Sequence, residues 1–184
     1  MLKTVFFMKD HRKCFRQGDL FQFRPGINLL VGEQGCGKST LLDLIRNSKE
    51  NKGVIALVAD PIQVTYFDFE KGNPRILSYM MDGPMGNLQM ASLFSSHGQS
   101  VNAVLGGLDS KDGILFLLDE PDMSLSVRSC YRLVKLMHRA AERKCQVIAA
   151  VHNPILIAGV PEVYSLEHRK WMKSAEFIAS HASE

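Results

Sequence analysis

The segment Gly32-Glu33-Gln34-Gly35-Cys36-Gly37-Lys38-Ser39 decides the fold of this chain of 184 residues. It satisfies the pattern G-x-x-x-x-G-K-[ST], in which a glycine-rich loop wraps a phosphate chain with inward-pointing backbone N–H groups. The pattern is informative only between a strand and a helix. Here an apolar run at 27–31 precedes it and a helically spaced stretch at 39–49 follows it. We therefore predict a phosphate-binding loop and not an accidental glycine-rich turn.

Two residues of this loop have predicted roles in neutralising charge. Lys38 is expected to neutralise the β- and γ-phosphates of a nucleotide during catalysis, and Ser39 is expected to ligate Mg²⁺. Cys36 is expected to be a small loop residue without a redox role. The predicted nucleotide-binding residues of this segment are Gly32, Gln34, Gly35, Cys36, Gly37, Lys38, Ser39 and Thr40.

A pair of carboxylates follows the most apolar run of the chain, at 114–118. Asp119 and Glu120 are therefore expected at the carboxyl edge of a sheet, beside the phosphate site. Asp119 suits the Mg²⁺ shell, and Glu120 suits the general base that takes a proton from an attacking water. Taken alone, an ordinary acidic pair at a strand end is an equally good interpretation. The preceding phosphate loop favours the catalytic one.

A histidine ends another apolar run. His152 follows the stretch 146–151, so its imidazole is expected at the same sheet edge, in reach of a γ-phosphate. A strand-end histidine is more often structural, but its position after two phosphate-site motifs favours a catalytic role. The remaining histidines, His11, His97, His138, His168 and His181, have no metal-ligand spacing.

The order of elements predicts an α/β fold with a mostly parallel central sheet. The stretches 2–8 and 20–23 are expected to pair as an N-terminal antiparallel β element. Further strands are predicted at 27–31, 54–59, 64–69, 114–118 and 146–151, and helices at 39–49, at 126–143 and after Pro154. A strand and a helix are expected in the tail, through Trp171 and Phe177. The glycine- and serine-rich region 71–113 is predicted as a small helical insertion, with helices near 76–81 and 99–106.

Composition fits one globular domain over residues 1–184, since 46% of the residues are hydrophobic. The formal net charge of +3 is too small to diagnose nucleic-acid binding. Scattered cysteines without C-x-x-C spacing are expected to be reduced thiols in the cytoplasm. No stretch approaches an apolar membrane span, and the N-terminus does not resemble a secretory signal. We expect no direct membrane insertion, so that any membrane role would need a separate subunit.

The order of these motifs resembles that of the ATP-binding-cassette (ABC) ATPase superfamily over nearly the whole chain. The short signature element of that family is matched at 95–99, where Ser96, Gly98 and Gln99 agree with the pattern and His97 replaces the usual first glycine. The resemblance implies ATP and Mg²⁺ as cofactors. It also implies a homodimer that closes head to tail over ATP, each signature element capping the γ-phosphate bound by the other subunit.

The chain departs from the family pattern in other elements. Residues 123–126 occupy the place of the D-loop, and Ser126 stands where an acid is usual. The Q-loop glutamine has no assignment. The residues near its expected place are Gln63, Asp68, Glu70 and Lys71. For adenine, Phe15 or Arg16 in the early loop is a candidate stacking group.

Within the superfamily, the signature spelling and the stretch 67–75 resemble small stand-alone ATPases of bacteria and phages, similar to the DNA-repair and chromosome-maintenance (SMC-like) branch. That resemblance implies an ATP-driven switch acting on DNA, a nuclease or another protein partner. A nucleotide-binding subunit of a membrane transporter and an ATP-binding regulatory module with little turnover stay open. A nucleotide kinase would fit the phosphate loop alone, but the LeuAspGluPro motif and His152 argue against it.

The predicted helix at 126–143 is rich in basic residues. It and the residue after it carry Arg128, Arg132, Lys135, Arg139, Arg143 and Lys144. These residues form either a partner-binding stripe or a solvated helix face, and the second arrangement is the commoner.

Overall fold

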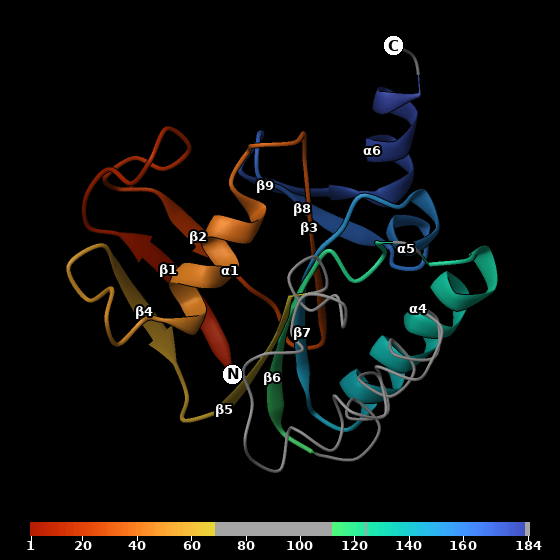
Figure 1. Ribbon diagram of the computed structural model, residues 1–184, viewed down its shortest axis with the longest axis horizontal. Coiled ribbons are helices and arrows are strands. Elements are labelled where there is room, and N and C mark those ends of the chain that lie inside the picture. The colour runs from red at the N-terminus through yellow and green to blue at the C-terminus, as the bar shows by residue number, and fades with distance from the viewer. Residues whose placement is uncertain (69–111, 124, 183–184) are drawn as a thin grey trace, which may run out of the picture.

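The computed structural model describes residues 1–68, 112–123 and 125–182 (Figure 1). The strands are β1 (Leu2–Phe7), β2 (Leu20–Gln22), β3 (Ile27–Val31), β4 (Ile55–Ala59), β5 (Gln63–Asp68), β6 (Ile114–Asp119), β7 (Gln146–Ala150), β8 (Glu162–Ser165) and β9 (Lys170–Lys173). The helices are α1 (Lys38–Arg46), α4 (Val127–Glu142), α5 (Pro154–Ala158) and α6 (Ser174–His181). The predicted insertion, apart from residues 112 and 113, lies outside the described residues. So do the predicted signature residues Ser96, Gly98 and Gln99.

The centre of the fold is a six-stranded sheet in the order β5-β6-β7-β3-β8-β9. All neighbours in it are parallel except β8 and β9, which are antiparallel. Every residue of β6 and β7 is buried, because the sheet is covered on both faces. The mixed α/β fold with a mostly parallel sheet is thereby confirmed.

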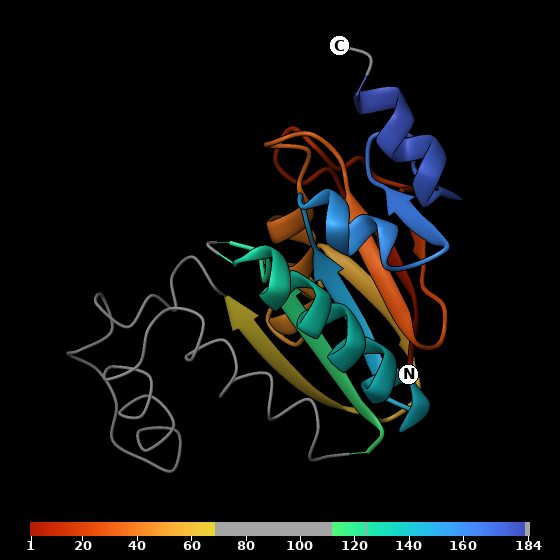
Figure 2. The same cartoon turned by 90° about the vertical axis from the view of Figure 1, so that its right-hand side faces the viewer.

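Side chains of the central strands alternate between two cores, as the period of a strand requires. Phe116 and Leu118 of β6 pack with Leu133 of α4 and with residues of α5 and α6. Leu115 and Leu117 pack on the other side with α1 and with the small sheet. Figure 2 shows α4 lying along one face of the central sheet. Helix α1 is thus enclosed between the two sheets.

The second sheet has three strands in the order β2-β1-β4, all antiparallel. The predicted pairing of the first two strands is confirmed, and β4 adds a third strand to it. The inward side of this sheet contributes Phe7 and Phe21 to the core beside α1, and the loop between β1 and β2 contributes Phe15. Phe7 and Phe15 stack with ring centroids 4.4 Å apart, and Phe21 meets Phe15 edge to face at 5.6 Å.

The C-terminal region differs from the prediction in one strand. The expected tail strand at Trp171 is β9 and the expected helix is α6, but β8 was not predicted. It has only four residues, and it forms because Tyr164 pairs with Leu30 of β3 at the centre of the molecule. None of the helices within the described ranges combines the length and the apolar character needed to cross a bilayer.

Phe15 supports both the core and the loop that follows β3. Its side chain is 1% exposed. A Cβ atom at Gly37, whose φ is +105°, would lie 2.8 Å from Cζ of Phe15. The aromatic ring and the loop backbone are therefore in direct contact, and only glycine fits between them.

We expect Phe15→Ala to lower the free energy of unfolding by about 3–5 kcal/mol, the range for removing a buried phenylalanine. Urea denaturation followed by circular dichroism measures the change. The neighbouring Arg16→Ala is the control, because its exposed ion pair with Asp10 is worth at most about 1 kcal/mol. Equal stability losses in the two variants would contradict this packing role.

Candidate functional site

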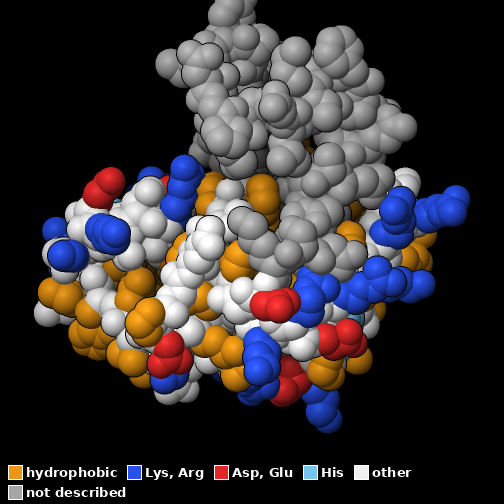
Figure 3. Space-filling model, turned by 90° about the horizontal axis from the view of Figure 1, so that it is seen from below, with side chains coloured by type: hydrophobic (Ala, Val, Ile, Leu, Met, Phe, Trp, Pro, Cys, Tyr) orange, Lys and Arg blue, Asp and Glu red, His pale blue; other side chains and the backbone are white. Residues whose placement is uncertain are grey.

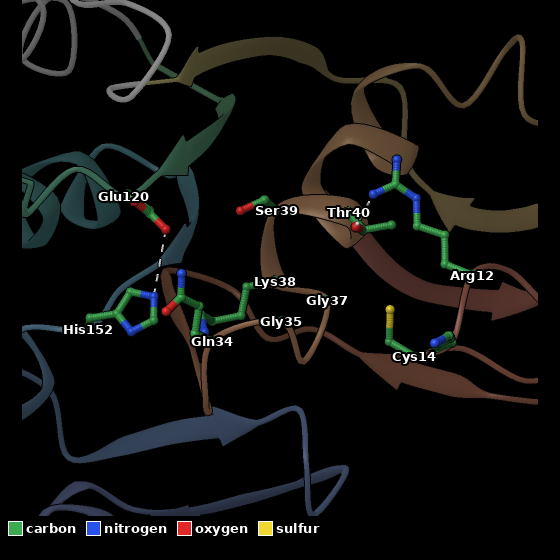
Figure 4. Close-up of a pocket in the computed structure, with 11 residues that line it drawn as sticks. Arg12, Cys14, Gln34, Gly35, Gly37, Lys38, Ser39, Thr40, Glu120 and His152 are labelled. Carbon is green, nitrogen blue, oxygen red and sulfur yellow. Dashed lines mark hydrogen bonds and ion pairs between the residues drawn. The ribbon is translucent and has the colours of Figure 1, made fainter.

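The carboxyl ends of β3, β6 and β7 meet at one edge of the central sheet. A pocket of about 350 Å³ opens there (Figure 4). It is lined by Arg12, Lys13, Cys14, Gln34, Gly35, Gly37, Lys38, Ser39, Thr40, Glu120 and His152. Eight of these residues belong to the predicted nucleotide-binding and catalytic set. The structure thus brings together residues that are far apart in the sequence.

The loop after β3 holds a buried lysine. The side chain of Lys38 is 5% exposed, and its Nζ donates to the carbonyl oxygens of Gly32 at 2.6 Å and Glu33 at 3.0 Å. Helix α1 begins at Lys38 after Gly37, which supplies no side-chain cap. The first N–H groups of the helix therefore remain suited to phosphate oxygens.

Two predicted residues of the same loop, Gly32 and Cys36, do not line the pocket, and neither does Asp119. Gly32 has a φ of +141°, and a Cβ atom there would lie 2.9 Å from Sγ of Cys36. Burial raises the pKa of the Cys36 thiol, so the group stays protonated and is a poor nucleophile at neutral pH. All four cysteines, each of them among the described residues, are free thiols. These contacts fit the prediction that Cys36 is a small loop residue.

Ser39 and Asp119 form the part of the site that fits a metal ion. Oγ of Ser39 lies 2.8 Å from Oδ1 of Asp119, and the side chain of Asp119 is buried. Among the described residues, no cluster of three His, Cys, Asp or Glu side chains is placed to hold a metal. Mg²⁺ bound with a nucleotide needs only one or two protein oxygens beside phosphate and water. The Ser39–Asp119 pair fits that requirement.

Tyr66 of β5 was missed by the sequence analysis. Its hydroxyl donates to Oδ2 of Asp119 at 3.2 Å, and the guanidinium of Arg46 lies 4.5 Å from the centre of its ring. Both oxygens of the Asp119 carboxylate therefore accept a hydrogen bond, Oδ1 from Ser39 and Oδ2 from Tyr66. Gln63 begins β5, whereas Asp68 at the other end pairs with Asp119, so Gln63 lies away from the site.

Glu120 and His152 face each other across the ends of β6 and β7. Oε1 of Glu120 lies 3.7 Å from Nε2 of His152, and the two side chains are 33% and 45% exposed. Glu120 has a φ of +50°, an unusual conformation for a residue other than glycine. Its N–H donates to the carbonyl of Ala150 at 3.1 Å. This local turn takes the chain out of β6 and leaves the carboxylate at the pocket, as Figure 4 shows.

Asp122 is a second residue that the sequence analysis missed. Its Oδ2 accepts from the backbone N–H groups of His152 at 2.8 Å and Asn153 at 2.6 Å. Its Oδ1 is buried without a hydrogen-bond partner among the described residues. The carboxylate therefore ties the turn that carries His152 to the turn that follows Glu120. The sequence signal that could have indicated a role for Asp122 is its position directly after Asp119-Glu120-Pro121.

The early loop contributes residues other than those predicted for adenine. The prediction that Phe15 stacks on adenine is wrong, because its ring is buried against Phe7. Arg16 does not line the pocket and pairs with Asp10. Instead, Arg12 lies at the pocket and donates to Oγ1 of Thr40 at 3.1 Å. Lys13 and Cys14 lie beside it.

Comparison with known proteins identifies the fold. The family model described as "AAA domain" matches residues 11–48, which contain the phosphate loop. The solved structure of cbiO1 from Clostridium perfringens, part of the ABC transporter complex cbiONQ, superimposes with a TM-score of 0.64 over 98% of this chain and 92% of that chain, at 14% identity. A chain of an inward-facing ABC transporter, described as of metal-chelate type, gives a TM-score of 0.62 over 95% of this chain and 84% of that chain, at 19% identity. The chain therefore has the P-loop NTPase fold that these ABC transporter components share.

A sequence relative agrees with this ABC-type fold. ABC transporter G family member 15 of Dictyostelium discoideum is 23% identical over 180 residues, covering 71% of this chain. The match spans only 12% of the length of that protein. These relatives are transporter components, so the resemblance to the DNA-repair branch stays a prediction.

We expect Asp122→Ala to lower the free energy of unfolding by about 1–3 kcal/mol, since two N–H groups lose a charged acceptor. Amide hydrogen exchange at His152 and Asn153 should become faster in the same variant. Asp122→Asn keeps a carbonyl oxygen in place and should retain most of the protection. Unchanged exchange at both amides in Asp122→Ala would show that the carboxylate does not hold the turn.

Proposed function

We propose that the chain binds ATP with Mg²⁺ and hydrolyses it, working as a head-to-tail homodimer that switches a DNA- or protein-processing partner in the cytoplasm. One observation carries the proposal. Four predicted side chains converge on one pocket from three different strand ends: Lys38, Ser39, Glu120 and His152. Asp119 does not line the pocket but contacts Oγ of Ser39. The ABC-type fold and the free thiols of the chain support it.

In this proposal the phosphate loop neutralises charge. Nζ of Lys38 exchanges its bonds with two loop carbonyls for oxygens of the β- and γ-phosphates. The N–H groups at the start of α1 bind the same phosphates. Ser39 and Asp119 hold Mg²⁺, which when bound neutralises the charge that develops in phosphoryl transfer. Binding and catalysis then depend on the same fixed charges.

Glu120 and His152 act on the γ-phosphate side. A partly exposed carboxylate can accept a proton from a water lying between it and the phosphate. The imidazole of His152, close to that carboxylate, donates to a γ-phosphate oxygen and orients the water. Asp122 fixes the backbone of His152, so the relative position of base and histidine is set before ATP binds.

The exposure of these groups supports the proposed dimer. Glu120 and His152 are open to solvent in the single chain. Closure of a second subunit over the pocket would exclude bulk water and strengthen every electrostatic contact. Ser96, Gly98 and Gln99 of that subunit are proposed to complete the γ-phosphate site.

A nucleotide-binding subunit of a membrane transporter is the second candidate. The observation that favours it is that the similar proteins are transporter components. Purification from the native host separates the two: a membrane protein retained in stoichiometric amount supports the transporter subunit, and its absence with nucleic-acid-stimulated hydrolysis supports the switch.

We expect Glu120→Gln to lower steady-state ATP hydrolysis at least about 100-fold, the loss typical of a missing general base. ATP binding should persist, so that dimers accumulate with ATP and Mg²⁺ and are detected by light scattering. Wild-type activity should rise faster than linearly with protein concentration. Glu50→Gln, an exposed acid outside the pocket, is the control. Linear activity independent of Glu120 would contradict the proposal and favour a regulatory module.

We expect Ser39→Ala to raise the Mg²⁺ concentration needed for half-maximal ATP hydrolysis by about tenfold or more, because an oxygen ligand is lost. A titration of Mg²⁺ at fixed ATP, after removal of metal by a chelator, measures this change. Ser39→Thr keeps the hydroxyl and should restore the wild-type requirement. An identical Mg²⁺ requirement in Ser39→Ala would remove Ser39 from the metal shell.

A further inference from the structure

The outer face of α4 carries four basic side chains, and the acidic Glu142 lies on it at the last residue of the helix. Cys130, Leu133, Met137 and Ala140 of this helix are buried against the sheet. Arg128, Arg132, Lys135 and Arg139 follow the spacing i, i+4, i+7 and i+11. At 3.6 residues per turn they form one row, on the side opposite the buried residues. The row is about 17 Å long at 1.5 Å per residue.

The segment that carries this row has a larger net positive charge than the whole chain. Residues 127–144 contain six Lys or Arg and one Glu, a formal charge of +5, whereas the whole chain has +3. The rest of the chain is therefore slightly acidic. Figure 3 shows Lys and Arg side chains gathered at the end of the molecule where α4 lies. Within the described part of the chain, no carboxylate lies within ion-pair distance of Arg128, Arg132 or Lys135.

A solvated helix face accounts poorly for this pattern. Solvated faces usually mix both signs, with opposite charges at i and i+4. Here Arg128 and Arg132 at i and i+4, and Arg132 and Lys135 at i and i+3, are like charges that oppose helix formation. A linear array of fixed positive charges is instead complementary to a linear polyanion.

An exposed aromatic ring lies beside the row. Tyr131 is 58% exposed and lies at i+3 from Arg128 and i−4 from Lys135. Rings placed beside a basic track stack with unpaired bases. A membrane surface fits less well, because interfacial helices insert an apolar face and that of α4 is buried in the core. We propose that the outer face of α4 binds single-stranded nucleic acid, with the basic row on phosphates and Tyr131 on a base.

This inference rests on the proposed function, for which it names a class of partner. Nucleic-acid binding is measured without ATP hydrolysis, so that the binding proposal and the hydrolysis proposal can be contradicted independently. Fluorescence anisotropy with a labelled single-stranded oligodeoxythymidine measures affinity over a series of salt concentrations. The variant Arg128→Gln/Arg132→Gln/Lys135→Gln should lessen the slope of log K against log salt by about 2, because three contacts contribute about 0.7 each. The matched control Lys49→Gln/Lys52→Gln/Lys170→Gln removes the same charge from exposed sites elsewhere and should leave the slope unchanged.

Tyr131→Ala should weaken binding about fivefold or more, and Tyr131→Phe should bind like wild type, because only the ring is needed for stacking. Thermal melting checks that the variants, all at exposed positions, remain folded. An unchanged slope in the α4 variant, or the same loss in the control, would overturn the proposal. Tighter binding of a duplex of equal length would overturn the single-strand assignment. So would α4-dependent binding to phosphatidylserine vesicles without binding to the oligonucleotide.

Discussion

Burial of the central sheet on both faces is the constraint on which the rest of the structure depends. Residues 115–118 of β6 and 147–149 of β7 are all apolar, because their side chains face one of two packed cores where an unpaired polar group would be costly. The buried polar residues of these strands, Asp119 and Gln146, lie at strand ends. Polar chemistry is possible only where the strands end. The parallel arrangement brings these ends to one edge. The glycine-rich loop, the pair Asp119 and Glu120, and His152 therefore become neighbours, although they lie far apart in the sequence.

The loop after β3 provides partners for its own buried charge. A buried ammonium group without partners would be costly, and Lys38 avoids that cost through two carbonyl oxygens of its own loop. The loop in turn lies on the ring of Phe15, which allows no side chain at Gly37. Under the proposed function, phosphate would replace these hydrogen bonds and would not have to order the backbone first.

The predictable parts of the fold are those whose signal is local. An apolar run followed by a glycine-rich loop, or by paired carboxylates, is visible within a few residues, which is why β3, α1, β6 and β7 were predicted. Strand β8 has little apolar character of its own and exists because Tyr164 pairs with Leu30.

The site was predictable only in its motifs, for a related reason. Residue type and position made Phe15 a candidate for adenine, but its stacking on Phe7 depends on how β1 and the early loop pack. The bonds from Asp122 to the turn at His152 and from Tyr66 to Asp119 join segments separated by 30 or more residues. No local pattern contains them.

The chain path links the site to α4. After Glu120 the backbone forms a turn with two local hydrogen bonds. The N–H of Met123 donates to the carbonyl of Glu120 at 3.0 Å, and the N–H of Leu125 donates to the carbonyl of Asp122 at 3.2 Å. Helix α4 begins two residues later, at Val127. A ligand on α4 can alter nucleotide binding only if it prefers one arrangement of this turn. If it does, thermodynamic linkage requires that ATP alter the affinity of that ligand by the same factor. The coupling would be carried by the segment that bears both the proposed base and the carboxylate that holds His152, and so would act where the γ-phosphate is expected.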